Sequence, residues 1–189
     1  MKKIAPLALG LIFVLVFILT YNSIVNNEEN VTEAFSQIES NIQRKADLLP
    51  NLVKVVKSYA KHETETFQAV AKLRTAKINM LNEAPSKEQV QKMIKLNKAI
   101  NNSTLKLFAV AEQYPQLRSS EQFLQLQAQI EGTENRINVT RMNYNTAVKE
   151  FNAQIRRFPS NLIASSFGFS KKEYFKAQES AKKDLVLDL

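Results

Sequence analysis

The chain has 189 residues and a formal net charge of +8, with no cysteine, no tryptophan and only three glycines. The absence of cysteine excludes disulfides, thiolate metal sites, iron–sulfur clusters, a cysteine nucleophile and a lipid-modified cysteine. The scarcity of glycine disfavours sheet-rich folds and phosphate-binding loops, which use glycine at turns and close approaches. The positive charge suits anionic lipid, nucleic acid or an acidic protein, and it concerns partners and not the fold.

The N-terminal segment is typical of a membrane-spanning helix. Residues 4–19 follow two lysines and carry no charge, and no charged residue recurs before Glu28. A spanning helix needs about 20 mainly apolar residues. Residues 4–25 meet this length, with Tyr21 suited to the membrane interface. The alternative is a cleaved signal peptide, but no good small-residue cleavage site follows the apolar run. The sequence therefore predicts an uncleaved transmembrane anchor over residues 1–25.

Apolar residues recur at helical spacing through the next part of the chain. Steps of three, four and seven mark one apolar stripe on each of four stretches, as in helices that pack into a bundle. The stripes run over Val31–Leu49, Leu52–Leu81, Val90–Ala111 and Phe123–Phe158. Strand alternation is not sustained there. We therefore predict an all-α fold in which about four long helices form an elongated antiparallel up-down bundle with coiled-coil packing.

Prolines and capping residues set the expected limits of these helices. Asp47 ahead of Pro50 suits a cap followed by a proline in the first turn, and Ser86 suits the cap of the third stretch. Ser119 and Gln122 have the spacing of a capping box. Pro50 could instead kink one very long helix, so this boundary stays open.

The helical pattern breaks after Pro159, where a short helix and then two aromatics around Gly168 follow. We expect residues 159–189 to form a hydrophobic flap and tail that pack on the bundle and close one end of it. The predicted division is thus an anchor over 1–25, a bundle over 26–158 and this C-terminal flap.

The patterns required for catalysis and metal binding are missing. His62 is the only histidine, and Thr66 stands where a zinc metalloprotease helix needs its second histidine. A Ser-His-Asp arrangement would have to use His62, which has no nucleophile elbow or glycine turn nearby. The ferritin-type carboxylate and histidine pattern is also missing. We predict no enzyme, with no catalytic residue, no cofactor and no metal.

One pair of opposite charges allows two interpretations. Glu134 and Arg141 lie two turns apart on one expected helix. If they face inward they form a buried ion pair, and if they face outward they are solvated. We favour an outward or boundary position because charged groups are seldom fully buried unless they are paired. The sequence does not decide whether Asp47, Glu134 and Arg141 are structural or functional.

A second charged feature is a run of lysines over residues 86–108 with one glutamate. These lysines are Lys87, Lys92, Lys95, Lys98 and Lys106. We favour a solvated helix face, and the alternative is contact with anionic lipid or an acidic partner. The lack of arginine and the near lack of aromatics in this stretch disfavour nucleic acid as a partner.

Long, ordered motifs run through nearly the whole chain. They are Tyr21–Val25, Ala34–Glu39, Arg44–Val53, Tyr114–Leu117 and Gln129–Ile137, followed by Arg141, Tyr144-Asn145, Phe151-Asn152, Phe158-Pro159 and Phe167-Gly168-Phe169. With these motifs the chain resembles the LemA family of bacterial membrane-anchored helical proteins, although Phe35 stands where that family more often has tryptophan. The resemblance implies a helical bundle behind one membrane helix, and it implies no agreed catalytic residue. A relative tied to organelle formation in magnetosome-forming bacteria implies a membrane-organising role.

Anchor and bundle together predict a membrane-tethered helical scaffold or protein-interaction module. Its unidentified protein partner would meet the helix faces or the aromatic end around Phe167–Phe175, and a homo-oligomer is also open. The alternative is a membrane-organising protein whose basic helix and bundle assemble on anionic lipid.

Charges around the span predict its orientation in the cell membrane. Lys2 and Lys3 precede the span, and no lysine or arginine follows it before Arg44. Because lysine and arginine near a span favour the cytoplasmic side, we expect a single-pass protein with a cytoplasmic N-terminus and residues 26–189 outside. The difference in basic residues between the two flanks is small, with two lysines before the span and none or one basic residue after it.

Overall fold

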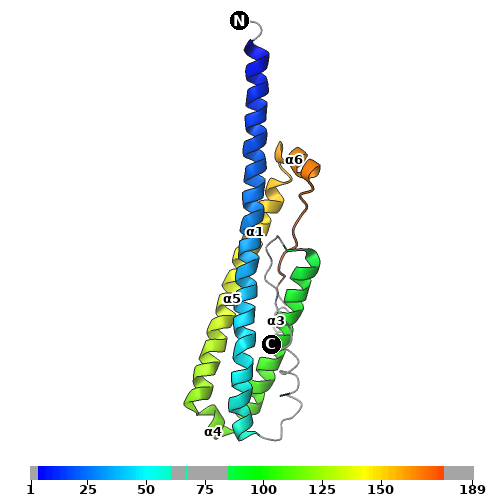
Figure 1. Ribbon diagram of the computed structural model, residues 1–189. Coiled ribbons are helices and arrows are strands. Elements are labelled where there is room, and N and C mark those ends of the chain that lie inside the picture. Colours follow the sequence, from blue (N-terminus) through cyan, green and yellow to red (C-terminus); the bar gives the residue numbers. More distant parts are fainter. Residues whose placement is uncertain (1–3, 61–66, 68–84, 177–189) are drawn as a thin grey trace, which may run out of the picture.

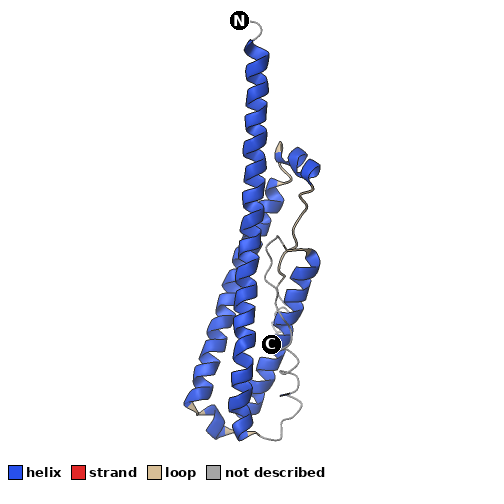
Figure 2. Ribbon diagram, in the orientation of Figure 1, coloured by secondary structure: helices blue, strands red, loops and turns tan. Residues whose placement is uncertain are grey.

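A computed structural model describes residues 4–60, 67 and 85–176. Within them the chain is helical apart from turns and one extended segment, and it contains no strand (Figure 2). This confirms the predicted all-α class. Several expectations lie outside the described residues, namely those on Lys2, Lys3, His62, Thr66, the apolar stripe between residues 61 and 84 apart from Phe67, and the tail from residue 177.

The longest element is α1, a helix that runs without a break over Ile4–Tyr59. Its N-terminal part projects beyond the other helices (Figure 1). The rest of α1 packs mainly against α5 (Glu121–Gln154) and also against α3 (Lys87–Glu112). One continuous helix therefore contributes both the projecting apolar segment and a wall of the bundle.

Pro50 lies inside α1, so the predicted helix boundary at this proline is wrong and the alternative of one very long helix is correct. Leu49 and Leu52 are both buried in the core. Packing on both sides of the proline therefore outweighs the roughly 3 kcal/mol that an internal proline costs a helix. Asp47 does not cap a helix, because its Oδ1 accepts a hydrogen bond from Gln43 Nε2 at 2.7 Å within α1.

The predicted start of α3 is confirmed. Ser86 is its N-cap, and the Ser86 Oγ accepts a hydrogen bond from the backbone N–H of Gln89 at 3.2 Å. The Gln89 side-chain oxygen accepts in return from the backbone N–H of Ser86 at 2.6 Å. This reciprocal pair satisfies two backbone donors that the first turn of a helix otherwise leaves without partners.

The predicted start of α5 is wrong by one residue. The cap is Ser120, whose Oγ accepts from the backbone N–H of Phe123 at 3.3 Å. Ser119 belongs to the end of the preceding short helix α4 (Pro115–Arg118), where it is the C-cap. The predicted capping box of Ser119 with Gln122 fails because the sequence pattern did not show this extra turn.

Contacts between residues far apart in the sequence show the relative directions of the long helices. Asn27 of α1 donates to Gln154 of α5, and further along α1 Lys45 meets Glu134, so α1 and α5 are antiparallel. Lys45 also contacts Asn101 of α3, which runs in the same direction as α1 and ends at α4 (Figure 1). The described residues contain these three long helices, and a fourth helix that completes an up-down bundle stays a prediction.

The predicted apolar stripes of the described helices form one core. Its buried residues include Val31, Phe35, Ile38, Ile42 and Leu49 of α1, Val90, Met93, Ile100, Leu107 and Ala111 of α3, and Phe123, Ile130, Ile137, Tyr144, Val148 and Phe151 of α5. Phe158 is an error of the prediction, since it is 81% exposed. The helix α5 ends at Gln154, and the turn that follows carries Phe158 away from the stripe.

After α5 the chain forms α6 (Ser160–Phe167), which lies beside α1 where α1 leaves the bundle (Figure 1). Gly168 ends α6 at φ 77°, a left-handed conformation that favours glycine because it has no Cβ. Residues 169–176, which we call the strap, then run back along the bundle as an extended segment. Together α6 and the strap are the described part of the expected C-terminal flap.

Candidate functional site

The first feature with a functional meaning is the apolar N-terminal part of α1. Among the helices in the described part of the chain, α1 is the one long and apolar enough to cross a membrane. Every residue from Gly10 to Leu19 is exposed, and Phe13 is 73% exposed. Ile24, in contrast, is fully buried. A helix that is apolar on all faces and has little of its surface covered by protein is suited to a lipid environment, because all its backbone groups bond internally.

Aromatic rings fix α6 and the start of the strap against this part of α1. The Phe167 ring centroid lies 5.9 Å from that of Phe17 and 5.1 Å from that of Tyr21. The Phe169 ring lies 6.0 Å from Tyr21 in a T-shaped arrangement. These separations are within the range in which aromatic pairs attract each other. The aromatic end of the predicted flap therefore docks on the apolar segment of α1, and Tyr21 is its centre.

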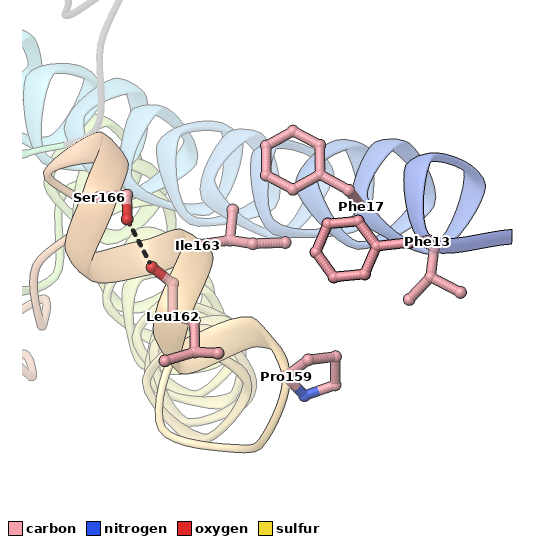
Figure 3. Close-up of a pocket in the computed structure, with 7 residues that line it drawn as sticks. Phe13, Phe17, Pro159, Leu162, Ile163 and Ser166 are labelled. Atoms are coloured by element: carbon pink, nitrogen blue, oxygen red, sulfur yellow. Dashed lines mark hydrogen bonds between the residues drawn. The ribbon is translucent and has the colours of Figure 1, made fainter. Parts of the chain in front are cut away.

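A groove with a volume of about 180 Å³ lies between α1 and α6, next to these ring contacts. Phe17 belongs both to the ring contacts and to the groove. Seven residues line it: Phe13, Val16, Phe17, Pro159, Leu162, Ile163 and Ser166. Figure 3 shows Phe13 and Phe17 on the α1 side and Leu162 and Ile163 on the α6 side. Ser166 is the only polar residue of this set, and its hydroxyl donates to the Leu162 carbonyl oxygen at 2.9 Å. The groove thus offers apolar contact and no polar side chain that is not already bonded.

Two asparagines of α5 hold the strap by their side chains. The Asn145 amide accepts from the backbone N–H of Phe175 at 2.9 Å and donates to the carbonyl oxygen of the same residue at 3.1 Å. The Asn152 amide repeats this pair with Lys172, at 2.8 Å and 2.9 Å. Each amide supplies the donor and the acceptor that a neighbouring strand would supply. These contacts give a structural role to two residues of the sequence motifs.

The strap is also bound by burial and charge. The Tyr144 hydroxyl donates to the Glu173 carbonyl oxygen at 2.8 Å, and burial, with a smaller effect of the Glu173 charge, raises the pKa of that hydroxyl. Lys172 Nζ lies 2.5 Å from a carboxylate oxygen of Glu28 and 5.5 Å from the centre of the Phe151 ring. The strap therefore joins α5 to α1 close to the point where α1 emerges from the bundle.

An ion pair that contains a buried lysine lies further along the bundle. Lys45 Nζ is 2.5 Å from Glu134 Oε2 and 2.6 Å from Asn101 Oδ1, and the Lys45 side chain is only 4% exposed. Glu134 is about one-third exposed, with its carboxylate turned towards Lys45, so it lies at the boundary of the bundle and the predicted boundary position is correct for it. The signal that could have found Lys45 is its spacing, because it continues the steps of four and three between Ile42 and Leu49 on the buried stripe.

Arg141 is not the partner of Glu134. Its guanidinium lies 5.2 Å from the centre of the Phe175 ring, and Nη1 donates to Asn138 Oδ1 at 3.3 Å. Its Nε is buried without a hydrogen-bond partner. Arg141 thus packs over the strap at the boundary of the bundle, so the predicted boundary position is correct for it and the ion pair with Glu134 is wrong. Sequence reasoning missed this contact because Phe175 lies 34 positions further along the chain.

The five lysines of α3, Lys87, Lys92, Lys95, Lys98 and Lys106, are exposed on the face opposite the buried stripe of that helix. Lys87 Nζ lies 3.9 Å from Glu173 of the strap. Among the described residues no group of three or more His, Asp and Glu side chains could hold a metal ion.

Comparison with known proteins shows which family and which curated proteins the chain is similar to. The family model described as the LemA family matches residues 34–187. Among curated relatives, the chain is 26% identical to magnetosome protein MamQ 2 of Paramagnetospirillum magneticum, over 92% of this chain and 71% of that protein. It is 25% identical to magnetosome protein MamQ of Magnetospirillum gryphiswaldense, over 86% and 67% of the two chains. It is also 25% identical to protein LemA of Metamycoplasma hominis, over 92% and 77%.

Proposed function

The chain belongs to the LemA family, and we propose that it is a single-pass membrane protein whose bundle acts as a scaffold for another protein. The apolar, uncovered segment of α1 supports the membrane location. The names of two relatives, which describe magnetosome proteins, fit a role in a membrane compartment for those proteins. In this proposal the chain performs no catalysis.

The observation that carries the proposal is the continuity of α1. The helix passes from the exposed segment ending at Leu19 to the fully buried Ile24 without a break. From Ile24 to Tyr59 its rise of 1.5 Å per residue gives about 53 Å. A bundle built on such a helix holds its distal end, at α4, at a fixed height above the bilayer. A fixed height is useful for a protein that positions a partner, whereas a tether alone needs only a flexible linker.

Exposed apolar side chains on the outer faces are the positions where we place the partner. Val139 and Met142 lie three residues apart on α5 and are 57% and 69% exposed. Leu105 of α3 is 64% exposed. Apolar residues three apart lie on one helix face, which is the pattern that a partner helix contacts.

In-membrane photo-crosslinking tests the proposal. A photo-reactive residue at Met142 of the full chain should give a protein adduct in intact membranes, and one at Leu15 should give lipid adducts. A flexible glycine-serine insertion between Asn22 and Ser23 should abolish the protein adduct while the protein stays in the membrane fraction. An adduct with a second copy would identify the partner as this chain. Absence of protein adducts from Met142, Val139 and Leu105 alike, or an adduct that survives the insertion, would contradict the scaffold.

The orientation is part of the same proposal, with the N-terminus in the cytoplasm and the bundle outside. Ser119 is exposed at the distal end of the bundle, and the chain has no cysteine of its own. A Ser119→Cys variant should therefore react with a membrane-impermeant maleimide in intact cells, or in spheroplasts where an outer membrane is present. Labelling only after the membrane is opened would place the bundle in the cytoplasm.

The second candidate is a membrane-organising role through the lysine face of α3, favoured by the exposure of all five lysines. Because α3 runs alongside α1, it stands upright when α1 crosses a membrane, with its N-terminal end nearest that membrane. Its lysines would then contact a second anionic surface more readily than the membrane that holds the anchor. Salt-sensitive recruitment of anionic vesicles to membranes that carry the protein would support this role, and its absence would remove it.

A further inference from the structure

The segment that contains α6 has an unusual charge pattern. Residues 158–170 carry no charged side chain, and they lie between Arg156-Arg157 and Lys171-Lys172. Arg156, Arg157 and Lys171 are exposed, whereas Lys172 is paired with Glu28. An uncharged segment between basic residues is the pattern of a chain that dips into a bilayer and leaves its charges among the headgroups.

The uncharged segment also exposes more apolar surface than a water-facing turn needs. Phe158, Leu162 and Phe167 are 81%, 58% and 53% exposed. They come from the turn before α6 and from two successive turns of it. Large exposed apolar side chains gathered in one short segment suggest a contact with protein or membrane.

The position of α6 along α1 decides between these two contacts. The groove between the helices reaches Phe13, while the ring contacts of Phe167 and Phe169 centre on Tyr21. Phe13 precedes Tyr21 by eight residues, which is about 12 Å along a helix. With Tyr21 at the membrane interface, α6 lies between the interface and that depth, which is close to the 5–10 Å to which interfacial helices are buried.

We propose that residues 158–170 insert into the same leaflet as the adjoining part of α1, and that the groove between α1 and α6 holds an acyl chain of an anionic phospholipid. The inference rests on the proposed membrane anchor. The groove is apolar, and its volume of about 180 Å³ is below the ~300–1,000 Å³ of small-molecule pockets, so it has room for part of one acyl chain. One wall consists of Phe13, Val16 and Phe17, which belong to the surface of α1 that lipid covers. Arg156 and Arg157 supply positive charge for a phosphate headgroup.

Tryptophan fluorescence in brominated lipid tests the insertion, because the chain has no tryptophan of its own. Three variants of the full chain are reconstituted in phosphatidylglycerol vesicles with or without bromine on the acyl chains. Leu162→Trp probes the groove, Leu15→Trp reports on the α1 segment, and Leu124→Trp is the matched control at the distal end, where Leu124 is 50% exposed. Phe158→Trp is a second probe of the segment should Leu162→Trp not fold.

The expected result is that bromine quenches Leu162→Trp as strongly as Leu15→Trp and leaves Leu124→Trp unchanged. Bromine near the headgroup should quench Leu162→Trp more than bromine near the chain end, because the segment is shallow. Quenching of Leu15→Trp without quenching of Leu162→Trp or Phe158→Trp would overturn the inference, and a partner protein on α6 would give this result. If Leu15→Trp is not quenched either, the membrane anchor itself fails.

The headgroup is tested in phosphatidylcholine vesicles that contain a minor fraction of brominated lipid. Leu162→Trp should be quenched more by brominated phosphatidylglycerol than by brominated phosphatidylcholine. The change Arg156→Gln with Arg157→Gln should abolish this difference. The matched control, Lys92→Gln with Lys95→Gln, removes the same charge from α3 and should preserve it. Equal quenching by the two lipids in the unaltered background would overturn the anionic headgroup.

Discussion

The two parts of α1 belong to one helix and bury their side chains in different ways. From Gly10 to Leu19 every residue is exposed, and nearly all of them are apolar. From Val31 to Val56 a buried apolar or lysine side chain recurs every three or four positions, and the other faces are mostly polar. Helix propensity does not distinguish the two parts, so the difference lies in their surroundings. The first part is suited to lipid on every side, and the second needs α3 and α5 to cover one stripe.

The same contrast applies to the polar groups of the two parts. In the apolar segment the hydroxyl of Thr20 donates to the Val16 carbonyl oxygen at 2.7 Å, so the helix satisfies it internally. In the bundle, Lys45 obtains its partners from α3 and α5. The bundle therefore depends on contacts between helices, whereas the apolar segment is complete by itself as a helix. Mutations at the two ends should differ accordingly.

The largest difference is expected between Phe151→Ala and Leu15→Ala. Phe151 is fully buried, whereas Leu15 is 51% exposed. Removal of a buried phenylalanine side chain costs about 3–5 kcal/mol through lost burial and a cavity. We expect this loss for Phe151→Ala in thermal or denaturant unfolding of the full chain in detergent. Leu15→Ala and the surface control Lys98→Ala should leave the transition nearly unchanged. Equal shifts for the three variants would remove the core assignment of α5.

The ion pair that contains the buried lysine gives the next largest effect. Glu134→Ala leaves Lys45 buried without its counter-charge, and we expect a loss of about 1–3 kcal/mol because Glu134 is itself one-third exposed. Replacement of both residues by methionine removes the unpaired charge and should recover much of the stability. A Lys45→Met, Glu134→Met variant less stable than Glu134→Ala would contradict this account of the pair.

The strap should respond to loss of a single amide. Asn145→Ala removes two hydrogen bonds to Phe175, each worth roughly 0.5–1.5 kcal/mol. We expect faster hydrogen exchange at the backbone of residues 172–175 and a smaller shift in global unfolding than Phe151→Ala causes. Asn135→Ala is the control on the same helix, because Asn135 is exposed, and it should leave the strap unchanged. An unchanged strap in both variants would mean that burial of Phe175 alone holds it.

The smallest expected effect is a stabilisation, whereas the preceding variants destabilise the chain. Gly132 lies within α5, and a Cβ added there would meet only Arg136 Nη1, at 3.9 Å. Gly132→Ala should therefore stabilise the chain by about 0.5–1 kcal/mol, because glycine inside a helix loses more backbone entropy on folding. A destabilised Gly132→Ala variant would show that this glycine faces a close neighbour.

Periodicity in the sequence predicted much of this fold. The stripes of α1, α3 and α5 are buried as expected, because an apolar stripe at helical spacing has few other ways to leave water. The helix ends at Pro50 and Ser119 were wrong because local signals competed with packing and with an extra turn at α4. Local propensity cannot show which of these effects prevails.

The candidate site was less accessible to sequence reasoning. The aromatic residues of the flap were recognised, but their docking on Phe17 and Tyr21 joins parts of the chain more than 140 residues apart. Lys45 had the spacing of the buried stripe and was still passed over, because a lysine on a stripe is more often at its edge. Contacts of this kind depend on how the helices are aligned with one another. The apolar pattern of one helix carries no information about that alignment.

The central claim is that the anchor and the bundle share one uninterrupted helix. The most direct test is an electron spin resonance distance between two labels on the full chain in lipid nanodiscs. Leu19→Cys and Ser40→Cys are suitable because both residues are exposed and the chain has no other cysteine. They are 21 residues apart, which is about 32 Å along an α-helix. The account predicts one narrow distribution near that distance, whereas a broad distribution or a clearly shorter distance would show a joint between anchor and bundle and would contradict it.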